Sequence, residues 1–265
     1  MIRSAHRSPG PAAAAPSVDR VADDGPVRFE STLVLAAVLT AVTGFVDAHV
    51  YLNVARVFVA NQSGNVVLTG IDIGEAQWST VIAHLVSIIM FAAGVAIGTT
   101  VHERRVASGL LVHPDLVLVA EAVMLVGLVV ARALHDSGPV VQADAVDDVI
   151  IAVGALAMGL QTVVIGRVGS VAVATTYESG AVARVGVEGA LALRRGAPAE
   201  KRARHMVVVK VLLVMIVAYA AGAAAAAAVS SSPAWLLVPA AVVLVTSFPV
   251  RRLAARARRE PTGAD

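Results

Sequence analysis

The chain has 265 residues, of which 57% are hydrophobic and only 15% are charged, and its mean hydropathy is +0.78. Soluble domains carry about 25% charged residues, so this composition excludes an ordinary soluble protein and predicts an integral membrane protein. The net charge of +2 is too small to indicate a nucleic acid partner, and the absence of cysteine excludes disulfides, thiolate metal sites and cysteine nucleophiles.

The first 30 residues are rich in Pro, Ala, Asp and Arg and show no apolar periodicity, so we expect a disordered cytoplasmic tail at 1–30. The first apolar run begins at Ser31 and is long enough to cross a bilayer. This length predicts an anchor that stays in the protein rather than a cleaved signal peptide. A basic cytoplasmic tail is expected at 251–265, where five arginines follow the last apolar run.

Six stretches are long and apolar enough to cross the membrane as helices. A helix rises about 1.5 Å per residue, so about 20 apolar residues span a hydrocarbon core of ~30 Å. The stretches are 31–52, 78–101, 110–134, 146–166, 206–229 and 234–250. We therefore expect an all-α membrane domain at 31–250, made of two halves with three spans each, 31–134 and 146–250.

Two further apolar segments, 54–74 and 170–190, carry polar residues at their centres. The first is centred on ANQSGN and the second on ATTYESG. A backbone break inside a bilayer is tolerated only where protein or water covers the freed polar groups. We therefore expect both segments to be re-entrant and to lie in the protein centre.

The placement of Lys and Arg predicts which loops face the cytoplasm. With both interrupted segments re-entrant, Arg104, Arg105 and the basic group at 194–204 lie inside, and the outer loops at 135–145 and 230–233 hold no Lys or Arg. If both segments crossed fully, the two arginines would move outside. We therefore expect a multi-pass protein of the bacterial inner (cytoplasmic) membrane with both termini cytoplasmic.

The two halves share a spacing that indicates an internal repeat. Gly64 follows Gly44 by 20 residues, and Gly180 follows Gly159 by 21. Each half has an odd number of crossings, so the halves have opposite orientations. Such a 3+3 inverted repeat is a common build of secondary transporters, in which the site lies near the midplane where broken helices meet.

Three stretches resemble the signatures of a known family. TGFVDAHVYL, FVANQSGNVVLTG and GLQTVVIGRVGSVAVATTYESGA are similar to the Gly-Phe-x-Asp, Thr-Gly-Asn and Gly-Leu-Gln with Thr-Thr-x-x-Thr-Gly motifs of the YoaK-like family, bacterial six-span membrane proteins of unknown function. The resemblance covers most of 31–250 and implies the architecture but no activity. Ser63 and Ser179 stand where Thr is usual in that family, and Thr162 stands where Asn is common.

The polar residues of the two interruptions are the candidates for a solute site. Helix ends freed by a break carry partial charges, which suit a small polar solute or ion. The candidates are Asn61, Ser63, Gly64, Asn65, Thr175, Thr176, Tyr177, Ser179 and Gly180. The alternative is a re-entrant loop whose polar side chains merely satisfy its own broken backbone, and the sequence leaves it open.

Three ionisable residues inside the spans are candidates for proton or ion coupling. Asp47 and His84 lie at similar depths by helix rise, so they could pair and exchange a proton near neutral pH, or form a structural clamp. Glu121 lies near the middle of its span, where a charge costs at least ~2.5 kcal/mol and usually faces a cavity or a partner. Its alternative is a hydrogen bond to a neighbouring helix. Arg184 and Glu188 have the i,i+4 spacing of a structural ion pair.

These features favour a transporter or channel for a small polar solute or ion, with its site at the midplane between the two Ser-Gly breaks. The alternative is a non-transporting structural or regulatory membrane subunit, and the discriminator is whether the polar clusters converge on one cavity. No enzyme and no cofactor or metal is expected, because nucleotide, nucleophile and metal-ligand motifs are not found. The expected partners are the lipid bilayer and the solute, and small helix faces leave a homo-oligomer open.

Overall fold

The structure is a computed structural model that describes residues 26–108, 114–136, 143–176, 178–229 and 231–256. Its main elements are α1 (Pro26–Val50), α2 (Gln62–Gly74), α3 (Trp78–Ala107), α4 (Pro114–Asp136), α5 (Ala143–Thr162), α6 (Glu178–Ala192), α7 (Ala199–Ala228) and α8 (Leu237–Arg256). A π-helical turn, η2 (Tyr51–Ala55), extends α1, and a 3-10 turn, η3 (Pro233–Leu236), precedes α8. The expected all-α class is confirmed.

The two interruptions expected from the sequence are both present as breaks between helices, but the second contains a hairpin that was not expected. Strands β1 (Arg167–Val168) and β2 (Val171–Ala172) pair antiparallel, with Arg167 opposite Ala172. Gly169 at the turn has a φ of 57°, which favours glycine. Most of the expected tails at 1–30 and 251–265 lies outside the described residues, although α1 already begins at Pro26 and α8 continues to Arg256.

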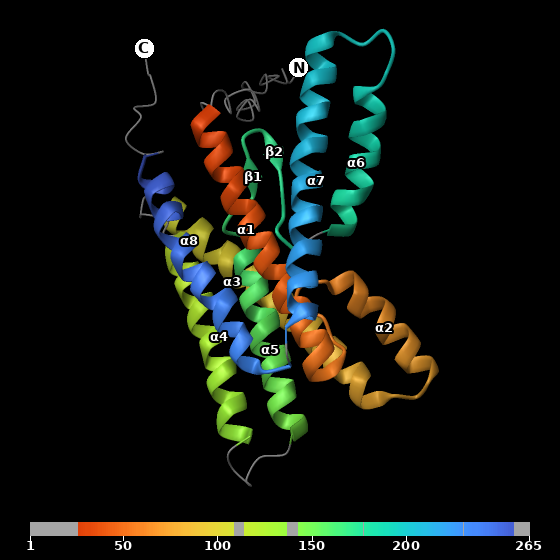
Figure 1. Ribbon diagram of the computed structural model, residues 1–265, viewed down its shortest axis with the longest axis vertical. Helices are drawn as coiled ribbons and strands as arrows, with labels where there is room; N and C mark the ends of the chain where they lie inside the picture. Colours follow the sequence, from red (N-terminus) through yellow and green to blue (C-terminus); the bar gives the residue numbers. More distant parts are fainter. Residues whose placement is uncertain (1–25, 109–113, 137–142, 177, 230, 257–265) are drawn as a thin grey trace, which may run out of the picture.

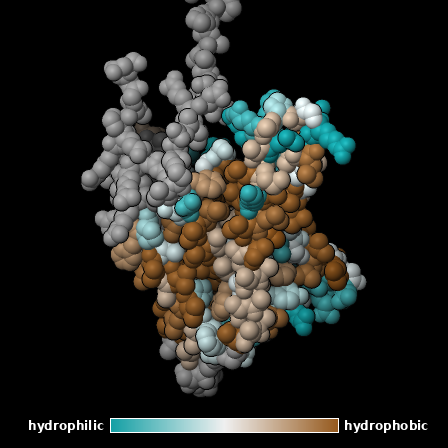
Figure 2. All heavy atoms as spheres, turned by 45° about the horizontal axis from the view of Figure 1, so that its top comes forward, coloured by the Kyte–Doolittle hydropathy of each residue, from teal (hydrophilic) through white to brown (hydrophobic). Residues whose placement is uncertain are grey.

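Four helices among the described residues are long and apolar enough to cross a membrane. They are Phe29–Ala55, Trp78–Arg105, Asp115–Ala133 and Ala199–Ala228, and the apolar segment Pro233–Pro249 is shorter. In Figure 2, apolar residues cover the middle of the coloured surface, and hydrophilic residues gather towards its ends. The chain is therefore a multi-pass membrane protein.

Two pairs of long helices form the centre of the molecule, α1 along α7 and α3 along α5 (Figure 1). The first pair is held close by a glycine from each helix. A Cβ on Gly44 would overlap the carbonyl oxygen of Tyr219, and a Cβ on Gly222 would overlap that of Ala41. Small residues of this kind let membrane helices approach closely.

The second pair repeats this contact. A Cβ on Gly94 of α3 would overlap the carbonyl oxygen of Leu156, and a Cβ on Gly159 of α5 would overlap that of Phe91. In both pairs the carbonyl belongs to the residue three positions before the partner glycine. The same crossing geometry therefore occurs twice in the molecule.

The remaining helices pack around these pairs. Helix α2 lies against α3, α6 lies against α7, and α4 packs on both α5 and α8. An ion pair between Arg132 Nη1 and Asp147 Oδ1, 2.7 Å apart, joins α4 to α5. Figure 1 shows α2 and α6 on the same side of the molecule, one towards each end. The two short helices therefore leave the centre in opposite directions.

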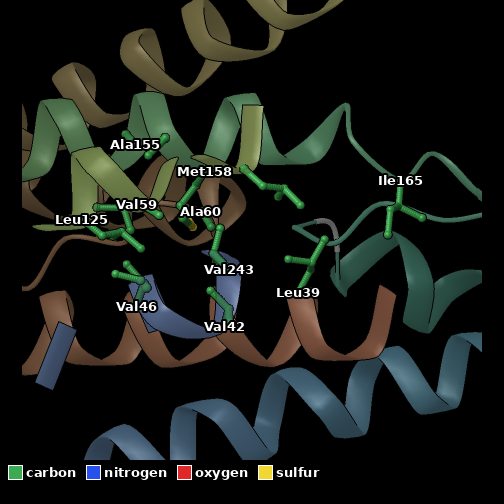
Figure 3. Packing of buried hydrophobic residues seen from close by; sticks show 14 of the residues in the cluster. Leu39, Val42, Val46, Val59, Ala60, Leu125, Ala155, Met158, Ile165 and Val243 are labelled. Carbon is green, nitrogen blue, oxygen red and sulfur yellow. The ribbon is translucent and has the colours of Figure 1, made fainter. Parts of the chain in front are cut away.

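The main apolar core surrounds the chain segment that precedes α2. Val59 and Ala60 are 0% and 1% exposed and belong to one cluster with Val46 of α1, Leu125 of α4 and Val243 of α8. Figure 3 shows these side chains together between the surrounding helices. Because the first break is part of the core, its backbone must find hydrogen-bond partners inside the protein.

Candidate functional site

The side chain of Asp47 holds the first break. After η2 the chain reverses at Arg56, which has a left-handed φ of 52°. Asp47 is 1% exposed, and its Oδ1 accepts the backbone N–H groups of Val59 and Ala60, both at 2.7 Å. Its Oδ2 accepts the N–H of Asn61 at 2.9 Å. These bonds satisfy the backbone that the break frees inside the membrane domain.

Asp47 also joins this break to α7. The hydroxyl of Tyr219 donates to Asp47 Oδ2 at 2.6 Å. All four partners are donors, so the carboxyl group acts as an acceptor only. The expected pairing of Asp47 with His84 is wrong, because the chain reversal fills the carboxyl with backbone donors, and His84 instead contacts Asp72 and Asn65.

Asn61 caps the new helix that follows the break. Its side-chain oxygen accepts the N–H of Gly64 at 3.1 Å and the hydroxyl of Ser63 at 2.9 Å, as is usual for an asparagine at a helix N-terminus. A Cβ on Gly64 would lie 2.9 Å from the ring of Phe58, so this glycine permits a close contact. Asn61, Ser63 and Gly64 therefore define the start of α2.

Asn65 fastens α2 to α3. Asn65 is 0% exposed. Its Nδ2 donates to the carbonyl of Phe58 at 2.7 Å and to Gln62 Oε1 at 2.9 Å. The same Nδ2 atom lies 3.1 Å from Ser87 Oγ. Its Oδ1 accepts the N–H of Phe58 at 3.0 Å. Every polar atom of this amide is therefore used inside the protein.

Two hydroxyl groups and a guanidinium, rather than a carboxyl, contact each other or the backbone at the second break, where Arg184 Nη1 donates to the carbonyl of Ala172 at 2.8 Å. The Oγ1 atoms of Thr162 at the end of α5 and Thr176 before α6 are 2.8 Å apart. Thr175 is 0% exposed, and its hydroxyl has no hydrogen-bond partner among the described residues. Tyr177 lies outside the described residues. Gly180 lines a neighbouring cavity of about 270 Å³ together with Arg184.

A cavity of about 380 Å³ lies between the two breaks. Its walls come from both breaks and from α3, α5 and α7. The lining residues are Ala60, Asn61, Gln62, Ser63, Phe91, Val95, Thr162, Ala174, Thr176, Ser179 and Tyr219. A cavity of this size with a few hydroxyl and amide groups on apolar walls is typical of a site for a small molecule.

The cavity brings together only part of the predicted site. Asn61, Ser63, Thr176 and Ser179 line it, whereas seven other predicted residues that the structure describes do not: Gly64, Asn65, Thr175, Gly180, Asp47, His84 and Glu121. Phe91, Tyr219, Gln62 and Thr162 also line the cavity, although none of them was among the predicted site residues. Tyr219 is the only Phe, Tyr or Trp of α7 and stands at the start of its Ala-rich end, and this contrast is a usable signal.

Glu121 lies apart from the cavity. It is 0% exposed, and neither carboxyl oxygen has a hydrogen-bond partner among the described residues. Leu118 and Leu125, three residues before it and four after it on α4, are also 0% exposed and belong to the main core. Glu121 is therefore an ionisable group on the core face of its helix.

Comparisons with known proteins agree with the resemblance found in the sequence. The model of a family described as a protein of unknown function (DUF1275) matches residues 35–249. Over 71 residues the chain is 42% identical to the UPF0700 transmembrane protein YoaK of Bacillus subtilis (strain 168), a match that covers 27% of this chain and 31% of that relative. The chain thus spans about a third of the length of this curated relative. No solved structure matches.

Proposed function

The chain belongs to the DUF1275 family, and from this premise we propose that it is a transporter or channel that moves a small polar solute or ion through the cavity between its two breaks. The observation that carries the proposal is the convergence of both breaks on one cavity. Asn61, Gln62 and Ser63 come from the first break, and Thr176 and Ser179 come from the second. Polar groups that served only their own loops would not need to share a cavity.

We propose that six helices cross the membrane, α1, α3, α4, α5, α7 and α8, and that α2 and α6 are re-entrant. Helix α2 has 13 residues and α6 has 15. At ~1.5 Å per residue they are about 20 Å and about 23 Å long, too short for a hydrocarbon core of ~30 Å. Both begin next to the central cavity, which supports helices that enter halfway and return.

An inverted 3+3 repeat accounts for how the helices pair. If α1 to α4 are exchanged with α5 to α8, the pair α1 and α7 becomes α5 and α3, and the pair α2 and α3 becomes α6 and α7, which are the pairs that pack together. The crossing glycines follow the same exchange.

The same exchange relates residues on opposite walls of the cavity. Phe91 lies three residues before the crossing glycine of α3, and Tyr219 lies three before that of α7. Ser63 and Ser179 are the serines of the two Ser-Gly breaks. A site on the axis between two halves of opposite orientation is the arrangement that alternating access uses.

The orientation that we propose places both termini in the cytoplasm and the protein in the bacterial inner membrane. It rests on the arginines near 104, 194–204 and 251–259 and on their absence from the expected outer loops. We propose no enzymatic activity, and a homo-oligomer fits helix faces rich in small residues.

Flux measurements on purified protein in liposomes test this function. The wild-type protein should move at least one member of a panel of amino acids, sugars, nucleobases and inorganic ions. Ser63→Phe and Ser179→Phe place rings in the cavity from exposed positions and should lower that flux at least tenfold. Thr100→Phe, at an exposed position of α3 away from the cavity, should leave it unchanged.

A negative flux screen would have a specific meaning if the protein also co-purified with a partner in a fixed ratio. That outcome would refute transport and favour the structural or regulatory subunit. Equal flux in all three phenylalanine variants would also contradict the proposal, because the cavity would then not be the path.

A further inference from the structure

Each short helix carries a carboxyl group that contacts a histidine of the long helix that follows it. Asp72 Oδ2 of α2 lies 3.2 Å from His84 Nε2 of α3. Glu188 Oε2 of α6 lies 2.6 Å from His205 Nδ1 of α7. Asp72 comes nine residues after Ser63 (72 − 63), and Glu188 comes nine after Ser179 (188 − 179). The two acids therefore occupy the same place in the two short helices.

His84 has an acceptor at each ring nitrogen. It is 1% exposed, and its Nδ1 lies 3.3 Å from Asn65 Oδ1. The backbone of Phe58 fixes the orientation of that amide, because the N–H of Phe58 donates to Oδ1 and its carbonyl accepts from Nδ2. Nδ1 must therefore donate, and the Nε2 of a neutral ring has no second hydrogen to offer to Asp72. The lone pair of Nε2 in a neutral ring therefore faces Asp72 Oδ2, a buried oxygen without a hydrogen-bond partner among the described residues, and an added proton on Nε2 would make this close contact attractive.

We propose that the pair of His84 and Asp72 is a proton-binding site, and that His205 with Glu188 is its counterpart in the second half. In each pair the imidazole would bind a proton beside a carboxyl group that stabilises the positive charge. This inference rests on the proposed transport function and deepens it, because it names the proton as the coupling ion. It also adds Asp72, Glu188 and His205 to the groups that act in transport.

The first pair is connected to the cavity wall by two hydrogen-bond steps. His84 contacts Asn65, and Asn65 donates to Gln62 Oε1 at 2.9 Å. Gln62 lines the cavity. Gain or loss of a proton on His84 would alter the hydrogen bond between Nδ1 and Asn65. Through Asn65 and Gln62 this alteration would reach the cavity wall.

Both acids reach the surface in part, so a proton can arrive from outside the protein. The side chains of Asp72 and Glu188 are 16% and 17% exposed, respectively. Figure 1 shows α2 and α6 towards opposite ends of the molecule, so the two pairs belong to short helices that leave the centre in opposite directions.

The charged residues near the two His–carboxyl pairs have other partners, apart from Arg184, which contacts Glu188. On the side of α3 that faces α5, Ala83 packs against apolar Ile151, and Asp147 of α5 is bound by Arg132. At the second pair, Arg184 Nε lies 3.7 Å from Glu188 Oε1, which confirms the ion pair expected from their spacing and adds a cation to that site. On α7, Glu200 and Arg204 pair with each other at 2.7 Å and are largely exposed.

Nitrogen NMR on the full chain in lipid nanodiscs tests proton binding without any solute. The protein is labelled with ¹⁵N-histidine, and the His84 signal is assigned with His84→Gln. The second ring nitrogen of His84 should lose its proton at a lower pH in Asp72→Asn than in the wild-type protein, because the carboxylate no longer stabilises the charged ring. Asp148→Asn, which changes an exposed acid of α5, should leave the signal unchanged. A neutral ring that does not respond to Asp72→Asn overturns the site.

Proton movement in liposomes tests the coupling. A pH-sensitive dye inside the vesicles reports proton entry while members of the solute panel are added outside. Solute-driven proton entry should fall at least tenfold in Asp72→Asn and Glu188→Gln, whereas solute exchange without a pH gradient continues. Glu200→Gln should behave as wild type. Solute flux without proton movement would overturn the coupling and leave the transport function intact. The absence of any flux would refute the proposed function. In that case the NMR spectra would still test proton binding.

Discussion

Asp47 places both carboxyl oxygens among four donors, and only a carboxylate supplies acceptors to all of them. Asp47→Asn puts an NH₂ group where acceptors are needed, so two buried donors lose their partner. We expect this change to lower the free energy of unfolding by at least about 2 kcal/mol, since a hydrogen bond to a charged group contributes about 1.5–3 kcal/mol. The midpoint of unfolding in detergent measures the loss.

Tyr219→Phe is the matched control for this prediction. It removes one of the four donors and keeps the aromatic ring, so it should cost less than Asp47→Asn, which leaves two buried donors without an acceptor. If Asp47→Asn were as stable as wild type, the carboxyl group would not hold the break. A loss of transport in Asp47→Asn is therefore informative only in variants whose folding has been measured.

Glu121 presents the opposite case, because a buried ionisable side chain without a partner works against folding. A charged group at the centre of a span costs at least ~2.5 kcal/mol on insertion scales. We expect Glu121→Leu to raise the midpoint of unfolding and Glu121→Gln to leave it within error. A lower midpoint in both variants would mean that the carboxyl group has a structural partner. If Glu121→Leu lowers transport but raises the midpoint of unfolding, the carboxyl group of Glu121 has a role in transport rather than in stability.

The sequence predicted the residues of the site that contrast with their surroundings. Asn61, Ser63, Thr176 and Ser179 stand out as polar groups in apolar segments, and all four line the cavity. The importance of Tyr219 depends on a helix more than 170 positions away in the chain, which no local pattern shows. Depth estimated from helix rise placed Asp47 beside His84, but the reversal after η2 brings backbone donors to Asp47 instead.

At the scale of the helices, the two glycine crossings determine how closely the long pairs approach. Gly222→Leu and Gly94→Leu should reduce the yield of monodisperse protein several-fold, because the added side chain meets a backbone carbonyl that cannot move aside. Gly127→Leu on α4 should be tolerated, because a Cβ there meets nothing within 4 Å. Size-exclusion chromatography after expression measures the yields. Equal yields for the three variants would refute the close approach.

Helix positions were predictable because apolar runs of helical length are a strong signal, and the start of α2 was predictable because ANQSGN interrupts one. The hairpin of β1 and β2 was not predictable in the same way. Its residues are mostly Val and Ala within a longer apolar run, which suits a helix or a strand equally. A Cβ on Gly169 at its turn would lie 2.9 Å from the ring of Phe29 in α1. The turn therefore packs against a residue distant in sequence, which no local pattern shows.

For the whole molecule, the absence of native cysteine makes the orientation directly testable. Ser231→Cys should react with an impermeant thiol reagent added outside intact cells. Ser108→Cys and Ala197→Cys should react only after the membrane is opened, because they follow α3 and precede α7 at the ends that we place in the cytoplasm. Labelling in the reverse pattern would invert the orientation and leave the pairing of the helices unchanged.

The two breaks occupy corresponding places in the two halves but are held by different hydrogen bonds. This difference bears on which side of the protein opens first. Opening the first break would separate Asp47 from four donors, whereas the described bonds of the second break include the contact of two threonine hydroxyls and the bond from Arg184 Nη1 to the carbonyl of Ala172. A molecule with two equal halves would have no preferred resting state. In the proposed transport cycle, this difference predicts that the side of α6 opens before the side of α2, so solute would reach the empty protein from the side of α6.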